Sequence, residues 1–251
     1  LRLRIEDRLF GPPGPRLVIA NSDMVRRELE EHFPHLRGRI RVVYNGVDVE
    51  RFSPELRERH RERVRAELNV PPEALLAIFV GHDWRRKGLY PFIEALGLLK
   101  GGMESRAVYG LVVGRGNRRF ARVFARRHGV EGRLRFTGPS EPDRYYGASD
   151  LLVLPSYYDA CPNVTIEALA CGLPVVTSVH TGSHALLTPG VDGLTVEDPS
   201  DTVSLARAIE HFGDPARLAA ATEAARRKAL RFPIEGQMDR IIEAIQSIAG
   251  R

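Results

Sequence analysis

Two acidic residues, Asp159 and Glu167, lie eight positions apart where a polar loop passes into an apolar stretch. Pro162 between them can occupy the first turn of a helix without losing a hydrogen bond, which would place Glu167 inside that helix. The first N–H groups of a helix have no partner within it and attract anions. Because carboxylates accept hydrogen bonds from hydroxyl groups, we expect a ligand that carries both hydroxyls and negative charge. The alternative is that both acids are structural, one in a turn and one in an ordinary helix.

A basic loop follows a strand-like apolar run in FVGHDWRRKG, residues 79–88. Arg85, Arg86 and Lys87 come after Gly81, where the apolar run ends. Ligands of open parallel sheets bind beyond the carboxyl ends of the strands, so this loop could present several donors to a diphosphate. A solvated basic loop is the alternative. Taken with the two acids, the loop favours a ligand with sugar hydroxyls and phosphates.

A glycine-containing turn follows another strand-like run in VVGRGNRRF, residues 112–120. Glycines such as Gly114 and Gly116 let a backbone approach a ligand closely, but tight turns also use them for geometry alone. The next glycine comes only at Gly129, and no acidic residue stands where a dinucleotide fingerprint needs a ribose ligand. The pattern therefore disfavours NAD.

The segments that must position these residues alternate between short apolar runs and amphipathic stretches. This alternation predicts an α/β fold with a doubly wound parallel sheet. We expect strands at residues 16–20, 40–44, 75–81, 107–113, 133–137, 150–154, 174–177 and 193–196. We expect helices at residues 22–32, 54–68, 88–99, 117–128, 141–147, 163–171, 183–187, 200–211, 214–229 and 234–248. Six of the strands lie within residues 75–196, which is enough for a complete Rossmann-like domain.

The chain is expected to divide into three parts. Residues 1–50 hold one strand-helix-strand unit, which cannot bury both faces of its strands, and are interpreted as the tail of an N-terminal domain and a linker. Residues 51–232 form the Rossmann-like domain. Residues 233–251 form a C-terminal helix, whose apolar stripe packs either on that domain or on the N-terminal one. The chain has no initiator Met, and we interpret it as a fragment.

Composition indicates a globular protein of a reducing compartment. The 251 residues are 43% hydrophobic, which is enough for a substantial core, and carry a formal net charge of +5. The two cysteines, Cys161 and Cys171, fit neither a disulfide framework nor a zinc site. No apolar run reaches the roughly 18 residues of a membrane span, so any membrane contact would be peripheral. We therefore expect a cytoplasmic location, with peripheral contact at the inner face of the membrane as an option.

Basic residues are spread over the whole chain, which argues against a nucleic-acid-binding protein. The run at residues 57–63 alternates basic and acidic side chains. We expect it to be a solvated helix face with ion pairs four residues apart. A surface for phosphates or anionic lipid is the alternative for this run.

Several segments, in order and over nearly the whole chain, resemble the retaining GT-B glycosyltransferases of family 4, or group 1. The D-x7-E spacing of Asp159 and Glu167, followed by ALACGLPVV, resembles the E-x7-E signature of that family. VIANSDMVRREL and VVYNGVDVERFSP resemble its inter-domain segment, and FVGHDWRRKGLYPFIEAL resembles its phosphate loop. LVVGRG, LRFTG and YYGASDLLVLPS resemble three later strands. The GHDWRRKG loop is most similar to the lipopolysaccharide core glucosyltransferase subgroup, whereas most members have Arg at the position of His82.

The resemblance implies roles for individual residues. Lys87, with Arg86, would neutralise the diphosphate leaving group, and Glu167 would hold the ribose hydroxyls. Asp159, one methylene shorter than the usual Glu, would face the donor sugar, so that Lys87, Asp159 and Glu167 are the expected catalytic residues. The other expected contacts to the nucleotide sugar are Gly81, Arg85, Gly138 in the loop that receives the base, and the backbone of Ala160, Cys161, Pro162, Asn163, Val164 and Thr165.

The function that the resemblance implies is transfer of a sugar from UDP-glucose, or a similar donor, to a cell-envelope glycan or the lipopolysaccharide core. GDP- and ADP-sugars are the alternative donors. We expect no cofactor and no metal, and no Asp-x-Asp motif occurs. The expected partners are the nucleotide sugar, the N-terminal domain and a glycan or lipid-linked acceptor. Without that domain the chain is expected to be inactive, and the alternative function is a non-catalytic nucleotide-binding or regulatory α/β module.

Overall fold

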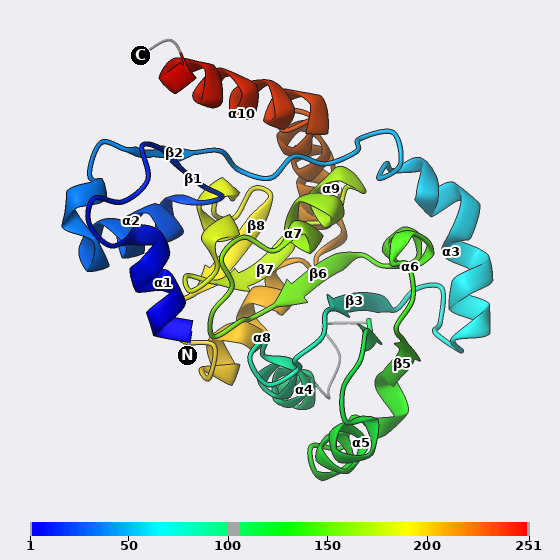
Figure 1. Ribbon diagram of the computed structural model, residues 1–251. Coiled ribbons are helices and arrows are strands. Elements are labelled where there is room, and N and C mark those ends of the chain that lie inside the picture. The colour runs from blue at the N-terminus through cyan, green and yellow to red at the C-terminus, as the bar shows by residue number, and fades with distance from the viewer. Residues whose placement is uncertain (1, 100–105, 250–251) are drawn as a thin grey trace.

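The computed structural model describes residues 2–99 and 106–249. At its centre is a sheet of six parallel strands in the order β5-β4-β3-β6-β7-β8 (Figure 1). The strands are β3 (Leu75–Val80), β4 (Val108–Val113), β5 (Leu134–Gly138), β6 (Leu151–Leu154), β7 (Val175–Ser178) and β8 (Gly193–Val196). Each of these six strands begins and ends within one residue of its predicted position, and the predicted doubly wound α/β class is confirmed.

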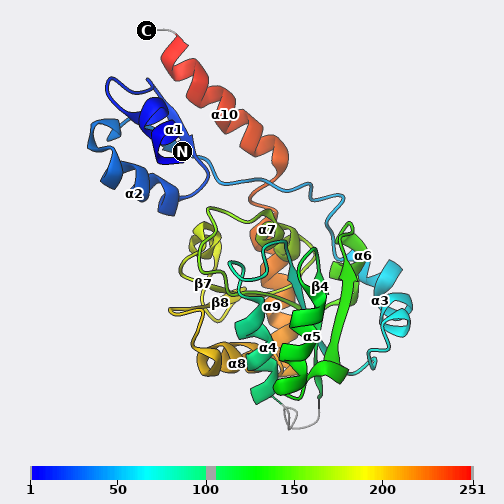
Figure 2. The same cartoon turned by 60° about the horizontal axis from the view of Figure 1, so that its bottom comes forward.

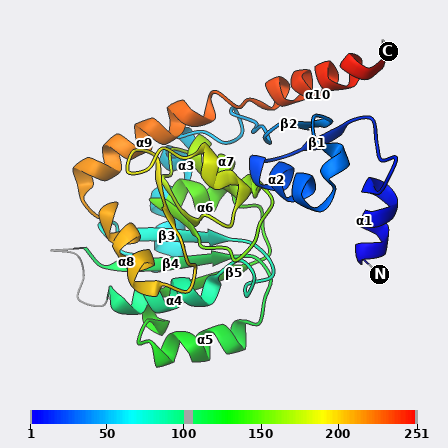
Figure 3. The ribbon, with the colours of Figure 1, turned by 90° about the vertical axis from the view of Figure 1, so that its left-hand side faces the viewer.

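Helices cover both faces of this sheet (Figures 1 and 3). One layer consists of α4 (Leu89–Leu98), α5 (Arg118–Arg127) and α8 (Thr202–His211). The other consists of α3 (Glu55–Glu67), α6 (Asp143–Ala148), α7 (Asn163–Ala170) and α9 (Pro215–Ala229). Two short 3₁₀ turns, η2 (Glu131–Arg133) and η3 (Gly182–Leu186), complete the connections, and the second stands where an α-helix was predicted.

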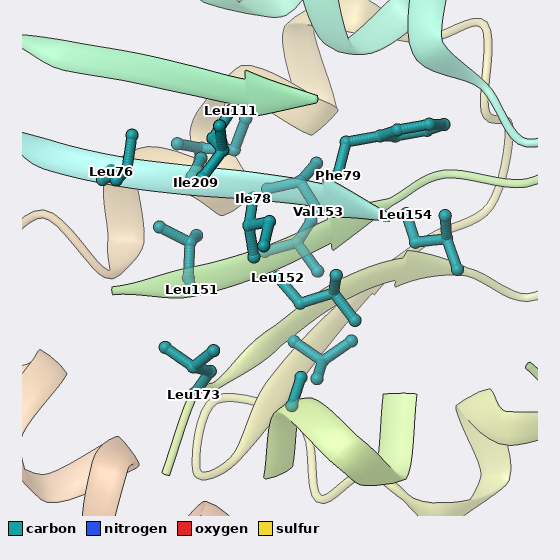
Figure 4. Close-up of a cluster of buried hydrophobic side chains, with 14 of the residues drawn as sticks. Leu76, Ile78, Phe79, Leu111, Leu151, Leu152, Val153, Leu154, Leu173 and Ile209 are labelled. Atoms are coloured by element: carbon teal, nitrogen blue, oxygen red, sulfur yellow. The ribbon is translucent and has the colours of Figure 1, made fainter. Parts of the chain in front are cut away.

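The strands are buried because helices pack on both sides of them. Every residue of β3 is buried, which explains why its sequence LLAIFV is continuously apolar and does not alternate. Figure 4 shows Leu76, Ile78 and Phe79 of this strand among apolar side chains of neighbouring strands and Ile209 of α8. Phe79 stacks on Phe92 of α4, with ring centroids 6.4 Å apart. This packing holds the carboxyl ends of the strands, and the loops that follow them, in place.

The N-terminal segment has a separate sheet and a separate small core. The parallel strands β1 (Val18–Ala20) and β2 (Ile40–Val42) flank α2 (Asp23–His32) and the turn η1 (Pro34–Leu36). Buried Ala20, Leu36 and Ile40 form the core of this unit. Helix α1 (Arg2–Phe10) precedes it and was not among the predicted elements. Its last residue packs on Phe33, with ring centroids 5.7 Å apart, a long-range contact that the charged sequence LRLRIEDRLF does not reveal.

The C-terminal helix α10 (Ile234–Ala249) extends along the N-terminal unit (Figures 1 and 2). Arg16 donates to the carbonyl oxygen of Ile248 at 2.9 Å, and the N–H of Gly46 donates to Oε1 of Gln237 at 2.9 Å. These contacts use polar groups and do not bury the predicted apolar stripe, most of which packs on neither part of the chain. A second face of the helix is exposed and contains Ile234, Met238, Ile242 and Ile245.

The basic run of α3 is only partly a solvated face, which corrects the expectation from sequence. The predicted pairs are present, since Arg59 contacts Glu55 and Arg63 contacts Glu67. The other side of the helix faces a buried carboxylate. Asp150, which is 1% exposed, lies 2.6 Å from Arg65 and 2.9 Å from Arg61, and Arg57 reaches it at 3.5 Å. Three of the arginines of α3 therefore fasten this helix to the start of β6.

Candidate functional site

The loops that contain the predicted site residues leave the sheet where its winding reverses. Strand β3 lies between β4 and β6, and the chain proceeds from β3 toward β4 but from β6 toward β7. At such a switch point the two following loops separate and leave a crevice, which is where open α/β sheets bind ligands. The loop after β3, residues 81–88, contains the basic cluster. The loop after β6, residues 155–162, contains Asp159.

The two loops are in direct contact with each other. Gly88, at the end of the basic loop, has φ = +79°, and a Cβ atom there would collide with the carbonyl oxygen of Pro155. A glycine is therefore required at this position for both conformational and steric reasons. The N–H of Tyr157 donates to the carbonyl oxygen of Arg86 at 2.8 Å. These contacts set the spacing of the side chains that the loops display.

The contact between the loops brings two cations to one carboxylate. Lys87 Nζ donates to Oδ2 of Asp159 at 2.8 Å, and both side chains are mostly shielded, with exposed fractions of 16% and 15%. A guanidinium nitrogen of Arg86 lies 3.8 Å from the same oxygen and donates to the carbonyl oxygen of Tyr158 at 2.6 Å. The stem of Lys87 crosses Gly81 so closely that a side chain at that position would collide with it. The structure thus brings together Gly81, Arg86, Lys87 and Asp159.

The start of α7 faces the same crevice from the end of the second loop. Pro162, which was predicted within the first helical turn, is instead the N-cap, with extended backbone just before that turn. No hydrogen bond joins the N–H groups of Asn163 and Val164 to an acceptor within the described residues, so both are available to an anion. Thr165 differs from the expectation. Its N–H donates to the carbonyl oxygen of Pro162 at 3.1 Å, and its buried hydroxyl bonds to that of Ser183, so it offers no free donor.

Glu167 occupies an environment of its own, apart from the Lys87–Asp159 pair. The hydroxyl of Tyr146, a fully buried residue of α6, donates to Oε2 of Glu167 at 2.9 Å. Burial raises the pKa of Glu167, and the hydrogen bond from Tyr146 lowers it against that trend, with a smaller lowering by Arg51. Tyr146 therefore holds one oxygen of the carboxylate in position. The other oxygen has no recorded partner within the described part of the chain.

The N-terminal unit braces the loop that leads to α7. The hydroxyl of Ser22, a residue with no exposed surface, donates to the carbonyl oxygen of Ala160 at 2.7 Å. The side-chain amide of Asn45 donates to the carbonyl oxygen of Cys161 at 3.2 Å and to Oδ1 of Asn163 at 2.7 Å. The backbone carbonyls of Ala160 and Cys161 in the predicted sugar-facing segment thus each accept a hydrogen bond that holds them in place.

Sequence reasoning missed these supporting residues for an identifiable reason. Ser22 has a local role as the N-cap of α2, since its hydroxyl accepts from the N–H of Val25 at 3.2 Å. Its bond to Ala160 spans 138 residues and has no local pattern. Tyr146 and Asn45 likewise act through partners 21 and more than 100 residues away. The one signal for such residues in the sequence is a polar residue next to an apolar run. This signal does not identify the hydrogen-bond partner.

The loop expected to receive a base follows β5, at the far side of β4. Gly138 has φ = +80°, and no atom lies within 4 Å of where its Cβ would be. Between this loop and the basic loop, Trp84 packs on Phe136 with ring centroids 5.7 Å apart. Gly116 touches the Trp84 ring, so this glycine serves packing. Arg85 is exposed, its guanidinium makes no hydrogen bond or ion pair within the described residues, and the structure does not bring it to Asp159.

Within residues 2–99 and 106–249, no group of three or more His, Cys, Asp or Glu side chains could hold a metal ion. In the same residues, no helix is both long and apolar enough to cross a membrane.

Comparison with known proteins gives a family. Residues 74–214 match the model of "Glycosyl transferases group 1", and residues 1–51 match that of "Glycosyltransferase Family 4". A D-inositol 3-phosphate glycosyltransferase from Corynebacterium jeikeium is 34% identical over 196 residues, which are 74% of this chain and 46% of that relative. The chain spans about half the length of the curated relatives it matches.

Solved structures agree in fold. WaaG, a glycosyltransferase involved in lipopolysaccharide biosynthesis, superposes with a TM-score of 0.84 at 23% identity, over 95% of this chain and 65% of its own. HepE from Anabaena, in complex with UDP-glucose, superposes with a TM-score of 0.81 at 24% identity, over 98% of this chain and 66% of its own. The group 1 match covers more than half of the chain, and the architecture is that of the same class, so the chain belongs to the group 1 glycosyl transferases of GT-B fold.

Proposed function

We propose that this chain is the donor-binding half of a retaining glycosyltransferase that uses a nucleotide diphosphate sugar. The observation that carries the proposal is the convergence of Lys87, Arg86 and Asp159 at the switch point of the sheet, beside the start of α7. Cations and free helix N–H groups suit a diphosphate, and carboxylates suit hydroxyl groups. The crevice combines both kinds of group within two adjoining loops.

In the proposed reaction, the bond from the anomeric carbon to the diphosphate oxygen breaks, and a bond to the acceptor oxygen forms on the same face. The diphosphate departs with the bonding electrons, and its oxygen takes up the proton that the acceptor hydroxyl gives up. Most of the developing negative charge lies on that leaving group, so its stabilisation lowers the barrier. Lys87 and Arg86 would supply this stabilisation together with the N–H groups of Asn163 and Val164.

The two carboxylates would recognise the rest of the donor. Glu167 keeps one oxygen on Tyr146, so its other oxygen would accept from the ribose hydroxyls. Asp159 would accept from hydroxyls of the transferred sugar while Lys87 turns toward the diphosphate. The segment from Ala160 to Thr165 would frame the sugar, and the loop after Gly138 would receive the base.

We propose UDP-glucose or a similar UDP-sugar as the donor, because HepE is described with UDP-glucose bound. A cell-envelope glycan, such as the lipopolysaccharide core, is the proposed acceptor, since WaaG acts in lipopolysaccharide biosynthesis. The name of the Corynebacterium jeikeium relative adds an inositol phosphate to the acceptors that should be assayed. The acceptor would be recognised by the part of the whole protein that the matched relatives have beyond this chain's span.

Calorimetric titration with UDP-, GDP- and ADP-glucose tests the donor site. We expect UDP-glucose to bind, and Lys87→Ala and Glu167→Ala each to weaken it by at least about tenfold, the effect of losing a charge-assisted hydrogen bond. Arg59→Ala is the matched control, because Arg59 is an exposed residue on the far side of α3 from Asp150. Binding that is equal in all three variants would contradict the site assignment. Equal binding of UDP-, GDP- and ADP-glucose, without discrimination among them, would favour a regulatory module.

A further inference from the structure

Helix α5 concentrates positive charge on one surface of the domain. Residues 115–128 contain six arginines and no acidic residue. The whole chain has a formal net charge of +5, so the remainder of the chain carries a net charge of −1. Basic residues occur along the whole chain, but elsewhere acidic residues balance them, so the net positive charge of the protein comes from this one segment. A charge distribution of that kind creates a local attractive field for a polyanionic surface.

The arginines of α5 are exposed, and several lack a counter-ion. Arg119, Arg122 and Arg127 have no ion-pair partner within the described part of the chain. Arg126 pairs with Glu131 at 2.7 Å, and Arg118 donates to the carbonyl oxygen of Phe136 at 2.8 Å. At least half of the six arginines in residues 115–128 are therefore not neutralised by an acidic residue within the described part of the chain.

Apolar side chains are exposed among these arginines. Phe120 is 46% exposed and Val123 is 42% exposed, although both belong to a helix whose inner face is already filled. Ala121 and Ala125 are buried against the domain, and Phe124 packs on Tyr90, with ring centroids 5.3 Å apart. Phe120 also meets Tyr90, with ring centroids 5.4 Å apart, yet nearly half of its surface stays exposed to solvent.

A surface hollow lies on the same face. It has a volume of about 680 Å³ and is lined by Arg118, Arg119, Arg122, Val123, Arg126 and Glu131. Four cationic groups against one carboxylate make it a receptor for an anionic group of a few atoms. The exposed apolar residues stand beside it.

We propose that α5 is a docking surface for an anionic lipid bilayer. A basic helix with a few exposed apolar side chains lies in the plane of the bilayer surface, where arginines contact lipid phosphates and apolar groups enter the acyl boundary. The hollow accommodates a lipid headgroup. A nucleic acid would also satisfy the arginines, but it offers no apolar phase to Phe120 and Val123. The exposed apolar pair therefore favours the bilayer.

The position of α5 allows such contact. The helix lies in the outer layer with α4 and α8, on the side of the domain opposite to α10 and the N-terminal unit (Figures 1 and 3). Its preceding loop joins the basic loop of the crevice, since the N–H of Arg115 donates to Nδ1 of His82 at 3.0 Å. A bilayer on α5 would thus lie next to the crevice without covering α10.

Sedimentation with lipid vesicles tests the proposal. The protein is mixed with vesicles of phosphatidylcholine alone or of phosphatidylcholine and phosphatidylglycerol in equal parts. We expect binding only to the anionic vesicles, and its loss at high salt. Each arginine near an anionic surface contributes roughly a fivefold change in partitioning, so the triple variant Arg119→Gln, Arg122→Gln, Arg127→Gln should lower partitioning by about a hundredfold.

A second triple variant removes the same charge elsewhere. Arg59, Arg63 and Arg227 are exposed by 60%, 79% and 68% and belong to surface pairs on α3 and α9. Their replacement by Gln should change partitioning by no more than about threefold, because these surface pairs lie away from α5. Phe120→Ala should lower the partitioning several-fold, and circular dichroism should show an intact fold in every variant.

Three results would overturn the proposal. The first is no binding of the unaltered protein to anionic vesicles at low salt. The second is an equal loss in both triple variants, which would mean that only net charge matters. The third is tighter binding of duplex DNA than of anionic vesicles at the same salt concentration, abolished by the α5 triple variant, which would assign this surface to nucleic acid.

Discussion

Lys87 and Asp159 are 72 residues apart in the chain, yet Lys87 Nζ lies 2.8 Å from Oδ2 of Asp159. The cation proposed for the diphosphate and the carboxylate proposed for the sugar are thus each other's partners. A diphosphate that draws Lys87 away would release the carboxylate of Asp159 to accept from sugar hydroxyls. Under the proposed function, the pair would therefore couple recognition of the diphosphate to recognition of the sugar.

This coupling predicts different effects on UDP and on UDP-glucose. Lys87→Ala should weaken the binding of both ligands by about tenfold or more, because it removes a charge from the diphosphate site. Asp159→Ala should leave the affinity for UDP unchanged or slightly higher, because Lys87 is then free, while the additional affinity for UDP-glucose is lost. Calorimetry with both ligands measures the two effects. Asp159→Ala with an undiminished preference for UDP-glucose over UDP would contradict the role of Asp159.

Tyr146→Phe should move the pH dependence of donor binding. The bond from Tyr146 lowers the pKa of Glu167, so its removal raises that pKa further above the usual range. Protonated Glu167 loses its role as an acceptor for ribose hydroxyls, and the fall in affinity on acidification should begin at a higher pH in the variant. Tyr145→Phe is the matched control, since the Tyr145 hydroxyl has no recorded hydrogen bond in the described residues. Identical pH profiles for Tyr146→Phe and the unaltered protein would refute this role.

Glu167→Gln should separate stability from binding. Burial raises the folded-state pKa of Glu167 above its unfolded value, so the ionised carboxylate costs the folded state free energy at neutral pH. Gln keeps an oxygen that accepts from Tyr146 and removes the charge. The free energy of unfolding, measured with urea, should be equal or higher in the variant, and the difference should shrink as the pH falls through the raised pKa. Donor affinity should fall at the same time. A large loss of stability at neutral pH would show that the carboxylate is structural.

Asp150→Asn should destabilise the protein by about 3–5 kcal/mol, because it leaves the buried guanidinium of Arg65 without its counter-ion. Burial raises the pKa of Asp150, but the three arginines and the N–H of Leu76 outweigh it, and the net shift is downward. Its stabilising contribution is therefore complete above the unfolded pKa of about 4 and is lost as the pH falls through the lower folded value. Urea unfolding at several pH values measures this. Glu223→Gln, in an exposed pair with Arg227, should change stability by less than about 1 kcal/mol.

The parts of this protein that sequence predicts are those that depend on local patterns. Continuous apolar runs located the six strands because buried parallel strands need apolar residues on both faces. Gly88 and the basic residues before it located a loop of the crevice. Helix α1 was missed because its stabilising contact, Phe10 with Phe33, comes from another element.

The remaining features depend on pairs that are distant in the chain. Arg61 looked like a member of a solvated run, and nothing local marked Arg65, because their partner Asp150 lies more than 80 residues away from both in the chain. Tyr146 gave no sign that it would hold Glu167. Thr165 fitted the pattern of a free helix start, yet a local turn uses its N–H and the packing of η3 uses its hydroxyl. Such pairings are decided by the fold as a whole.

The bonds from Ser22 to Ala160 and from Asn45 to Asn163 have a consequence for protein engineering. A chimera that combines the donor half of this protein with the acceptor half of a relative would ordinarily be joined in the linker, near residue 50. With that junction, positions 22 and 45 would come from the relative. The loop before α7 would then lose its native hydrogen bonds to Ser22 and Asn45. A junction before β1, near residue 16, keeps both braces native. A chimera designed to transfer donor specificity should therefore be joined before the strand-helix-strand unit, although sequence alone assigns this unit to the N-terminal domain.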